Sequence, residues 1–170
     1  MKTPRSTIGI VAFVGLYALS SLASAKGPSA ADVKSIDSII SAYYEVISGP
    51  SGYQYDAARD QNLHAPNALI TRVSDGMPLQ RHDLLTEQQP LKAPYPEGFF
   101  EYEIGRIVQV YEGIAHVWST YEIRKAPSSE VTGRGVNSIS LYYDESRWWI
   151  ASWSTQLEGK VPLPAKYISK

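Results

Sequence analysis

The stretch that decides the fold is "RGVNSISLYYDESRWWIASW", residues 134–153. Two runs rich in β-branched and aromatic residues flank the turn sequence "DESR", and this pattern predicts an antiparallel β-hairpin. Strict alternation places Trp148 and Ile150 on one face of the second strand. It places Trp149 and Trp153 on the other face. One face then packs on helices as core, and the other is exposed unless the C-terminal tail or a second subunit covers it.

Long β-rich runs fill the second half of the chain. They span residues 99–111, 114–125, 135–143 and 147–158. Hairpin connections such as Glu112-Gly113 join them, and successive strands joined in this way form an antiparallel meander. The sequence therefore predicts one sheet whose strands follow each other in chain order.

Helical patterns precede these strands. We predict a long amphipathic helix that Ser29 caps and that ends at Gly49, because apolar residues between them recur at three- and four-residue spacing. A second, shorter helix is predicted over residues 55–66, a short strand over 68–73, and a third short helix over 81–90. Helices followed by long antiparallel strands indicate an α+β fold in which the helices cover one sheet face. A sheet that curls around the first helix leaves a cone with an open mouth.

The first 25 residues have the features of a secretory signal peptide. Lys2 and Arg5 precede an apolar run over residues 8–19, and Ala23-Ser24-Ala25 forms a cleavage site. An uncleaved anchor helix is the alternative, but the apolar run is short for a membrane span. We therefore expect a signal peptide over 1–25, one domain over 26–159, an extended tail over 160–170, and a periplasmic or secreted protein with no membrane segment after cleavage.

Charge and cysteine content exclude several classes of function. Removing Lys2 and Arg5 with the signal leaves 14 basic residues against 17 acidic ones, a net charge of −3. No basic stripe remains, which argues against nucleic-acid binding, since such proteins neutralise phosphates with Lys and Arg. The chain has no cysteine, so it has neither a lipid-attachment cysteine nor a disulfide framework.

Four strings of the sequence resemble the NTF2-like superfamily, which includes SnoaL-like proteins and ketosteroid isomerases. They are "IISAYYEVISG", "AARDQNLHAPNALI", "GIAHVWSTYEIR" and the closing hairpin "RGVNSISLYYDESRWWIASW". The resemblance implies an NTF2-like cone, a curved antiparallel sheet wrapped around a long N-terminal helix with two shorter helices. It also implies a homodimer through the outer sheet face. It implies no single function, because this superfamily includes enzymes, binding modules and association domains.

The resemblance extends to individual residues on the first helix and first strand. Ketosteroid-isomerase-like members use a tyrosine on the first helix to donate to the substrate oxygen, and Tyr43 or Tyr44 matches that place. Their general-base aspartate would fall near Thr71 or Arg72. Neither residue is a carboxylate, so the chain departs from the isomerase pattern at the base.

The three histidines offer a weaker match. Scytalone-dehydratase-like chemistry uses two histidines and an aspartate, and His64 and His116 with Asp56 or Asp60 match this set loosely. With His82, the histidines lack the spacing of a metal-binding motif. No glycine-rich phosphate loop is present either. We therefore expect neither a metal nor a cofactor.

One strand carries several candidate polar residues with a period of two. One face of this strand carries His116, Trp118, Thr120 and Glu122. If this face points into the cone, a histidine, a hydroxyl and a carboxylate share one wall and form a general acid/base set. If it points outward, these residues serve packing or solvation. Asn137 on the next strand either orients a ligand carbonyl or satisfies backbone groups.

The preceding strand carries charged residues of both signs. Glu101 and Glu103 alternate with Phe100 and Tyr102, which indicates a half-exposed strand with its acids toward water. Alternation places Arg106 on the opposite face of this strand from Glu101 and Glu103, among apolar residues. It is either the counterion of an anionic ligand or half of an internal ion pair, and the ion pair is the favoured interpretation.

Three hypotheses of function follow. The leading one is a domain that binds a small, mostly apolar ligand in its cone, with no specific chemistry. The residues expected to bind it are Tyr43, Tyr44, His116, Trp118, Thr120 and Asn137. The alternative is a general acid/base enzyme of the SnoaL, ketosteroid isomerase or scytalone dehydratase type, with His116, Tyr43 and Glu122 as candidate catalytic residues. The third is a non-catalytic dimerisation module with a filled cone.

Overall fold

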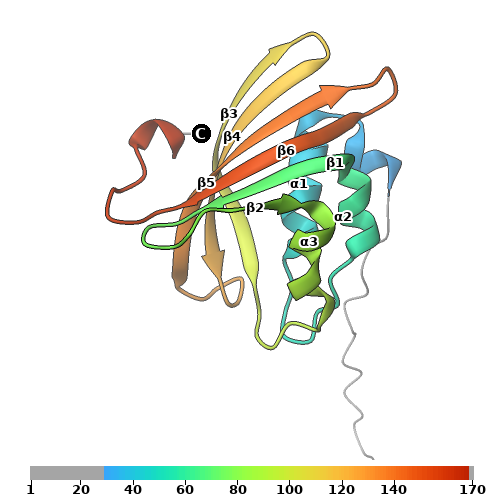
Figure 1. The fold of residues 1–170 in the computed structure, drawn as a ribbon. Coiled ribbons are helices and arrows are strands. Elements are labelled where there is room, and N and C mark those ends of the chain that lie inside the picture. The colour runs from blue at the N-terminus through green and yellow to red at the C-terminus, as the bar shows by residue number, and fades with distance from the viewer. Residues whose placement is uncertain (1–28, 169–170) are drawn as a thin grey trace, which may run out of the picture.

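A computed structural model describes residues 29–168 of the chain, so the signal peptide predicted over 1–25 lies outside the described residues. Among these residues the α-helices lie against one curved sheet (Figure 1). The helices are α1 (Ile36–Ile47), α2 (Ala57–Leu63) and α3 (Leu84–Gln88), with short 3-10 helices η1 (Ala30–Val33), η2 (Gln89–Lys92) and η3 (Ala165–Tyr167). The strands are β1 (His64–Val73), β2 (Gln80–Asp83), β3 (Phe100–Tyr111), β4 (Ile114–Arg124), β5 (Val131–Tyr143) and β6 (Trp148–Leu157). No helix among the described residues is long and apolar enough to cross a membrane.

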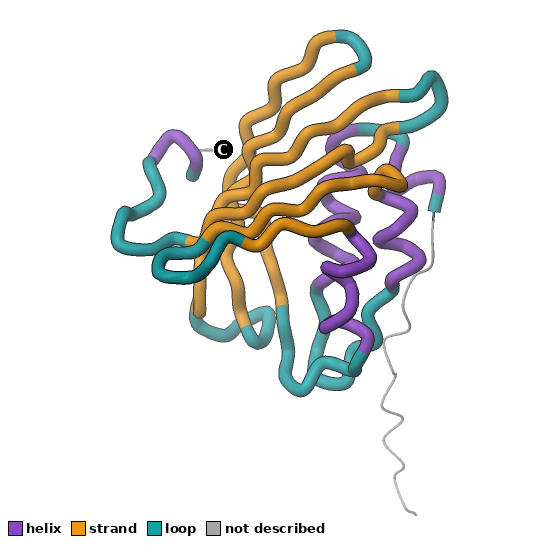
Figure 2. The backbone as a smooth tube through the Cα atoms, viewed as in Figure 1, coloured by secondary structure: helices purple, strands orange, loops and turns teal. Residues whose placement is uncertain are grey.

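The six strands lie in the order β2-β1-β6-β5-β4-β3. All neighbours are antiparallel except β1 and β6, which run parallel. This parallel pair arises because the chain leaves the β1–β2 hairpin and crosses, through α3 and η2, to the far edge of the sheet before it begins β3. Figures 1 and 2 show α1, α2 and α3 gathered on one face of the curved sheet. The predicted α+β cone is confirmed, with the edge strand β2 as an addition.

The long first helix predicted from Ser29 is split into two elements. Ser29 caps only the short helix η1, and α1 begins after Ser35. Ser35 and Ser38 form a reciprocal capping box, in which each side chain accepts from the other's backbone N–H at 3.1 and 3.0 Å. At the other end, Gly49 is not a helix cap but a β-bridge partner of Phe99, and this bridge ties the end of α1 to the start of β3.

A β-bulge in β6 changes which tryptophan faces the core. The register shifts by one residue between the pairs Ser140↔Ser152 and Leu141↔Ile150. Ile150 and Trp153, expected on opposite faces, therefore both point to α1 and are 0% and 5% exposed. The strict alternation predicted for this strand is wrong beyond residue 150.

A second bulge in β3 brings its charged residues to one face. The register shifts between Glu103 and Gly105. Arg106, which strict alternation places on the other face of the strand, therefore lies on the same face as Glu103. Their side chains form a two-bond ion pair at 2.8 and 2.6 Å. The preference for an internal ion pair at Arg106 is confirmed, and Arg106 also contacts Asp37 at the start of α1.

The core lies between α1 and the concave face of the sheet. Its buried side chains include Ile39, Ile40, Tyr43 and Val46 of α1 and Val117, Ile139, Ile150 and Trp153 of the sheet. On the convex face, the C-terminal tail lies against β3 and β4, where Tyr167 packs on Trp118 with ring centroids 5.2 Å apart. Thr120 donates to the Tyr167 carbonyl at 2.5 Å. The tail thus covers part of the outer sheet face.

Candidate functional site

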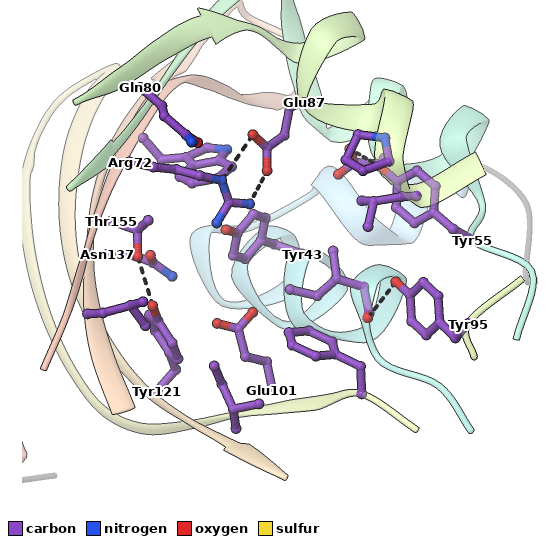
Figure 3. A pocket seen from close by; sticks show the side chains of 18 of the residues that line it. Tyr43, Tyr55, Arg72, Gln80, Glu87, Tyr95, Glu101, Tyr121, Asn137 and Thr155 are labelled. Atoms are coloured by element: carbon purple, nitrogen blue, oxygen red, sulfur yellow. Dashed lines mark hydrogen bonds and ion pairs between the residues drawn. The ribbon is translucent and has the colours of Figure 1, made fainter. Parts of the chain in front are cut away.

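A cavity of about 540 Å³ lies between the concave face of the sheet and the helices. This volume is in the range that small-molecule sites occupy. Figure 3 shows side chains from α1, α3 and the strands converging on it. Its aromatic lining comprises Tyr43, Tyr55, Tyr95, Phe99, Tyr121 and Trp153. Its polar lining includes Arg72, Glu87, Glu101, Asn137 and Thr155. The cone is therefore open inside, with aromatic walls and a few polar groups.

Glu101 places an unpartnered carboxyl in this cavity. Its position on β3 opposes Ile123 of β4, whose side chain also faces the cavity. The sequence suggested that Glu101 points to water, and that expectation is wrong because residues 101 and 103 share the face that packs toward α1. Among residues 29–168 the carboxyl has no hydrogen-bond or ion-pair partner. Enclosure by the protein raises the pKa of Glu101 to about 8, and the more distant positive charge of Arg72 opposes this only in part.

Tyr43 places a free hydroxyl in the same cavity. Its ring is fixed by edge contacts with Trp153 and Tyr44, at centroid distances of 5.8 and 5.3 Å. Within the described chain its hydroxyl has no hydrogen-bond partner. Burial, with the nearby Glu101, raises the pKa of Tyr43 well above its ordinary value, so the hydroxyl stays neutral and able to donate. Figure 3 shows this hydroxyl and the Glu101 carboxyl pointing into the same space.

An ion-pair cluster lies at the rim of the cavity. Arg72 Nε donates to Glu87 Oε2 at 3.1 Å, Arg72 Nη2 also contacts Glu87, and His82 Nε2 lies 2.5 Å from Glu87 Oε2. Burial works against the charge of Glu87, but the contacts from Arg72 and His82 outweigh it and lower the pKa of Glu87. Arg72 is thus engaged by Glu87, and its charge is largely balanced before any ligand enters.

A second polar network is fully satisfied within the protein. Trp153 Nε1 donates to His64 Nε2 at 3.1 Å, and His64 Nδ1 lies 2.9 Å from the Asp60 carbonyl. Because an indole N–H can only donate, His64 accepts at Nε2 and carries its proton on Nδ1. The Asp60 carboxylate accepts from Tyr55 at 2.5 Å and from Gln88 at 2.8 Å. His64 and Asp60 therefore fix the cavity wall, with no free nitrogen on His64 for catalysis.

Tyr44 lies behind the cavity wall rather than in it. Its hydroxyl is 2.7 Å from Ser119 Oγ and accepts from Asn137 Nδ2 at 3.3 Å. Ser119 donates in turn to Glu103, which pairs with Arg106. Of the residues expected to bind a ligand, Tyr43 and Asn137 line the cavity. Tyr44 instead supports Asn137 from behind.

The remaining candidate residues lie on the outer face of the sheet. They are His116, Trp118, Thr120 and Glu122. The opposite face of β4 carries Val117 and Tyr121, which pack against α1 in the core. On that outer face His116 is 2.9 Å from Ser138 Oγ and Glu122 pairs with Arg124. Of the two alternatives for this strand, the outward one is therefore correct, and these residues form no acid/base set inside the cone. The pairing of His116 with His64 and an aspartate is excluded for the same reason.

No cluster of three or more His, Asp or Glu side chains within residues 29–168 is arranged to hold a metal ion.

The sequence reasoning identified neither Glu101 nor the Arg72–Glu87 pair as part of a site. A signal for Glu101 exists in the pairing of β3 with β4, since a residue opposite Ile123 shares its face. That signal requires the register of the hairpin, which the bulge at residues 103–105 alters.

No protein-family model matches the sequence, and no curated protein matches it. Solved structures do resemble the fold. An NTF2-like protein of unknown function from Shewanella baltica OS155 is 13% identical with a TM-score of 0.54, over 74% of this chain and 92% of that one. A candidate ketosteroid isomerase from Parabacteroides distasonis ATCC 8503 is 14% identical with a TM-score of 0.52, over 76% and 97% of the two chains.

A candidate association domain of Ca/calmodulin-dependent kinase II from Exiguobacterium sibiricum 255-15 is also similar. It is 12% identical with a TM-score of 0.52, over 74% of this chain and 92% of that one. At such low identity the likeness shows the fold alone. The chain has the NTF2-like cone, and this cone is shared by proteins with different assigned functions.

Proposed function

We propose that this NTF2-like chain binds a small, mostly apolar molecule in its cone. The observation that supports this most is the cavity of about 540 Å³, in which the Glu101 carboxyl and the Tyr43 hydroxyl have no partner among residues 29–168. Polar groups inside an aromatic cavity are costly when unpaired. A ligand with an apolar body and one or two polar atoms would satisfy both groups. The predicted signal peptide adds export to the proposal, to the periplasm or beyond.

The test is binding of a neutral fluorescent probe, N-phenyl-1-naphthylamine, whose emission rises in apolar surroundings. We expect saturable binding to the wild-type protein. Ile123→Trp places a larger ring in the cavity wall and should weaken binding at least tenfold. Ile114→Trp is the matched control, because Ile114 lies on the same strand at the exposed outer face. If the wild-type protein shows no saturable binding, or if the two variants behave alike, the proposal fails.

A second candidate function is general acid/base catalysis in the same cavity. The specific observation in its favour is Glu101, whose pKa of about 8 suits proton transfer near neutral pH. Glu101 would take the role first considered for His116, with the neutral hydroxyl of Tyr43 as donor. Glu101 lies on β3 rather than near Thr71 on β1, where the isomerase resemblance places the base.

A β,γ-unsaturated ketosteroid tests the isomerase form of this candidate, because conjugation of its double bond is followed by ultraviolet absorbance. We expect Glu101→Gln to reduce the rate at least 100-fold while N-phenyl-1-naphthylamine still binds. A wild-type protein that leaves the steroid unchanged would remove this form of the candidate.

Of the two features of the proposed dimerisation module, we keep pairing through the outer sheet face and drop the filled cone. The open cavity disfavours a filled cone. Pairing of two copies through the outer sheet face is still proposed, but η3 already covers Trp118 and Thr120 there. A partner would therefore contact the uncovered part of the face, toward the exposed Tyr111 and Ile114.

A further inference from the structure

We infer that the ligand of this cavity is an organic cation, a single protonated amine on a mostly apolar body, with its ammonium group on Glu101. The inference rests on the proposed function and specifies the class of ligand. It stands on three features of the cavity. They are the balance of charge, the missing partner of one carboxyl, and the aromatic lining.

The charged residues that line the cavity are mainly acidic. They are Asp60, Glu87, Glu97 and Glu101 against the single Arg72. Glu87 balances Arg72 at the rim, and Glu97 pairs with Lys125 at 2.8 Å. Asp60 accepts hydrogen bonds from the neutral donors Tyr55 and Gln88. Once Glu101 ionises, its negative charge has no cation of its own in the interior, and a cationic ligand complements it.

Among residues 29–168, Glu101 is the acid of this group whose carboxyl has no partner. Figure 3 shows Arg72 turned toward Glu87, while the carboxyl of Glu101 points into the open space. The hydroxyl of Tyr43, which faces that space, offers an oxygen that can accept a second N–H bond from an ammonium group. Aromatic walls attract cations through their ring faces. A carboxylate, a hydroxyl and aromatic rings together form a site for a partly desolvated ammonium.

The groups around Glu101 determine the pH at which its carboxyl loses its proton. They are Tyr43 and Tyr44 from α1, Arg72 from β1 with Glu87 from α3, Tyr95 before β3, and Tyr121 from β4. With no ligand, burial keeps the pKa of Glu101 at about 8. At pH 7 roughly nine-tenths of the carboxyls are then protonated. An ammonium beside Glu101 favours its ionised form, so binding of a cation releases about 0.9 proton at pH 7.

Two indoles of nearly equal shape test the inference. Tryptamine carries an ammonium where tryptophol carries a neutral hydroxyl. Isothermal titration calorimetry at pH 7, in two buffers with different ionisation enthalpies, gives both the affinity and the number of protons released. We expect tryptamine to bind at least tenfold more tightly than tryptophol and to release about 0.9 proton, while tryptophol releases none.

Two variants assign the effect to one carboxyl. Glu101→Gln should bring the two affinities within threefold and abolish proton release. Glu130→Gln is the matched control, because Glu130 is exposed in the β4–β5 loop and does not line the cavity. It should keep the preference for tryptamine.

The outcomes separate this inference from the proposed function. If N-phenyl-1-naphthylamine binds but tryptamine neither displaces it nor binds more tightly than tryptophol, the cavity binds neutral molecules and the inference is overturned. Persistence of the tryptamine preference in Glu101→Gln overturns it as well. If neither the indoles nor the naphthylamine bind, the proposed function itself has failed.

Discussion

Replacing Glu101 by glutamine should stabilise the protein at high pH and leave it nearly unchanged at low pH. In the fold the pKa of Glu101 is about 8, against 4.5 for an unburied glutamate. Below pH 4.5 both the folded and the unfolded chain hold the proton. Between 4.5 and 8 the unfolded chain loses it while the folded chain retains it, so the free energy of unfolding falls as pH rises. The amide of the Glu101→Gln variant carries no charge at any pH, so the variant escapes this loss.

The size of the effect follows from the two pKa values. They differ by about 3.5, and each pH unit corresponds to about 1.4 kcal/mol, which gives an upper limit of about 5 kcal/mol. Water that enters the cavity screens the carboxylate and reduces the penalty. We therefore expect the free energy of unfolding of Glu101→Gln to exceed that of the wild type by about 2 to 4 kcal/mol at pH 9. At pH 5 the two values should lie within about 1 kcal/mol of each other.

Urea denaturation at pH 5, 7 and 9, followed by tryptophan fluorescence, measures this difference. Glu130→Gln is the control, since Glu130 is exposed in the β4–β5 loop, and its difference from the wild type should not change with pH. The reasoning is refuted if the advantage of Glu101→Gln is the same at pH 5 and pH 9. It is also refuted if the variant is the less stable protein at pH 9.

Three further outcomes test the fold and the assembly. Arg59→Met leaves two carboxylates without their buried partner and should cost about 3 to 5 kcal/mol in urea unfolding, while Lys34→Met at the surface should cost under about 0.5 kcal/mol. Trp153→Phe removes a buried hydrogen bond and should cost about 1 to 3 kcal/mol, more than Trp149→Phe, whose indole donates to an exposed carboxylate. Light scattering should give about twice the subunit mass for the purified protein and one subunit mass for Ile114→Glu, and a monomeric wild type would contradict the outer-face dimer.

The fold could be predicted from the sequence because its signals are local. Alternating strand runs, turn sequences and helix periodicity each specify an element, and their order indicates the α+β cone. The bulges could not be predicted in the same way. A bulge adds one residue to a strand, and every side chain beyond it then points to the opposite sheet face from the one that strict alternation predicts. In β6 this reversal brought Trp153 into the core, and in β3 it joined Arg106 to Glu103.

The site was harder to predict because it depends on which face of β4 points inward. Both faces of this strand carry large apolar side chains, Val117 with Tyr121 on one and Trp118 on the other. Composition therefore does not distinguish the two faces. The C-terminal tail resolves this ambiguity, since Tyr167 covers Trp118 and allows a large ring on the outer face. The tail and β4 are far apart in sequence, and no local pattern links them.

Protonation of Glu101 affects both the stability of the fold and the proposed affinity for an amine. The unpaired carboxyl lowers the stability of the ligand-free fold as pH rises from 4.5 to 8. A bound ammonium pairs with the carboxylate and returns that free energy, so the affinity for an amine should rise over the same pH range, since fewer carboxyls then have to lose a proton. Stability and amine affinity are thus expected to change with pH in opposite directions and by related amounts. A neutral ligand would leave the affinity nearly insensitive to pH over this range, and the contrast follows from the Glu101 carboxyl, which has no partner within the described chain.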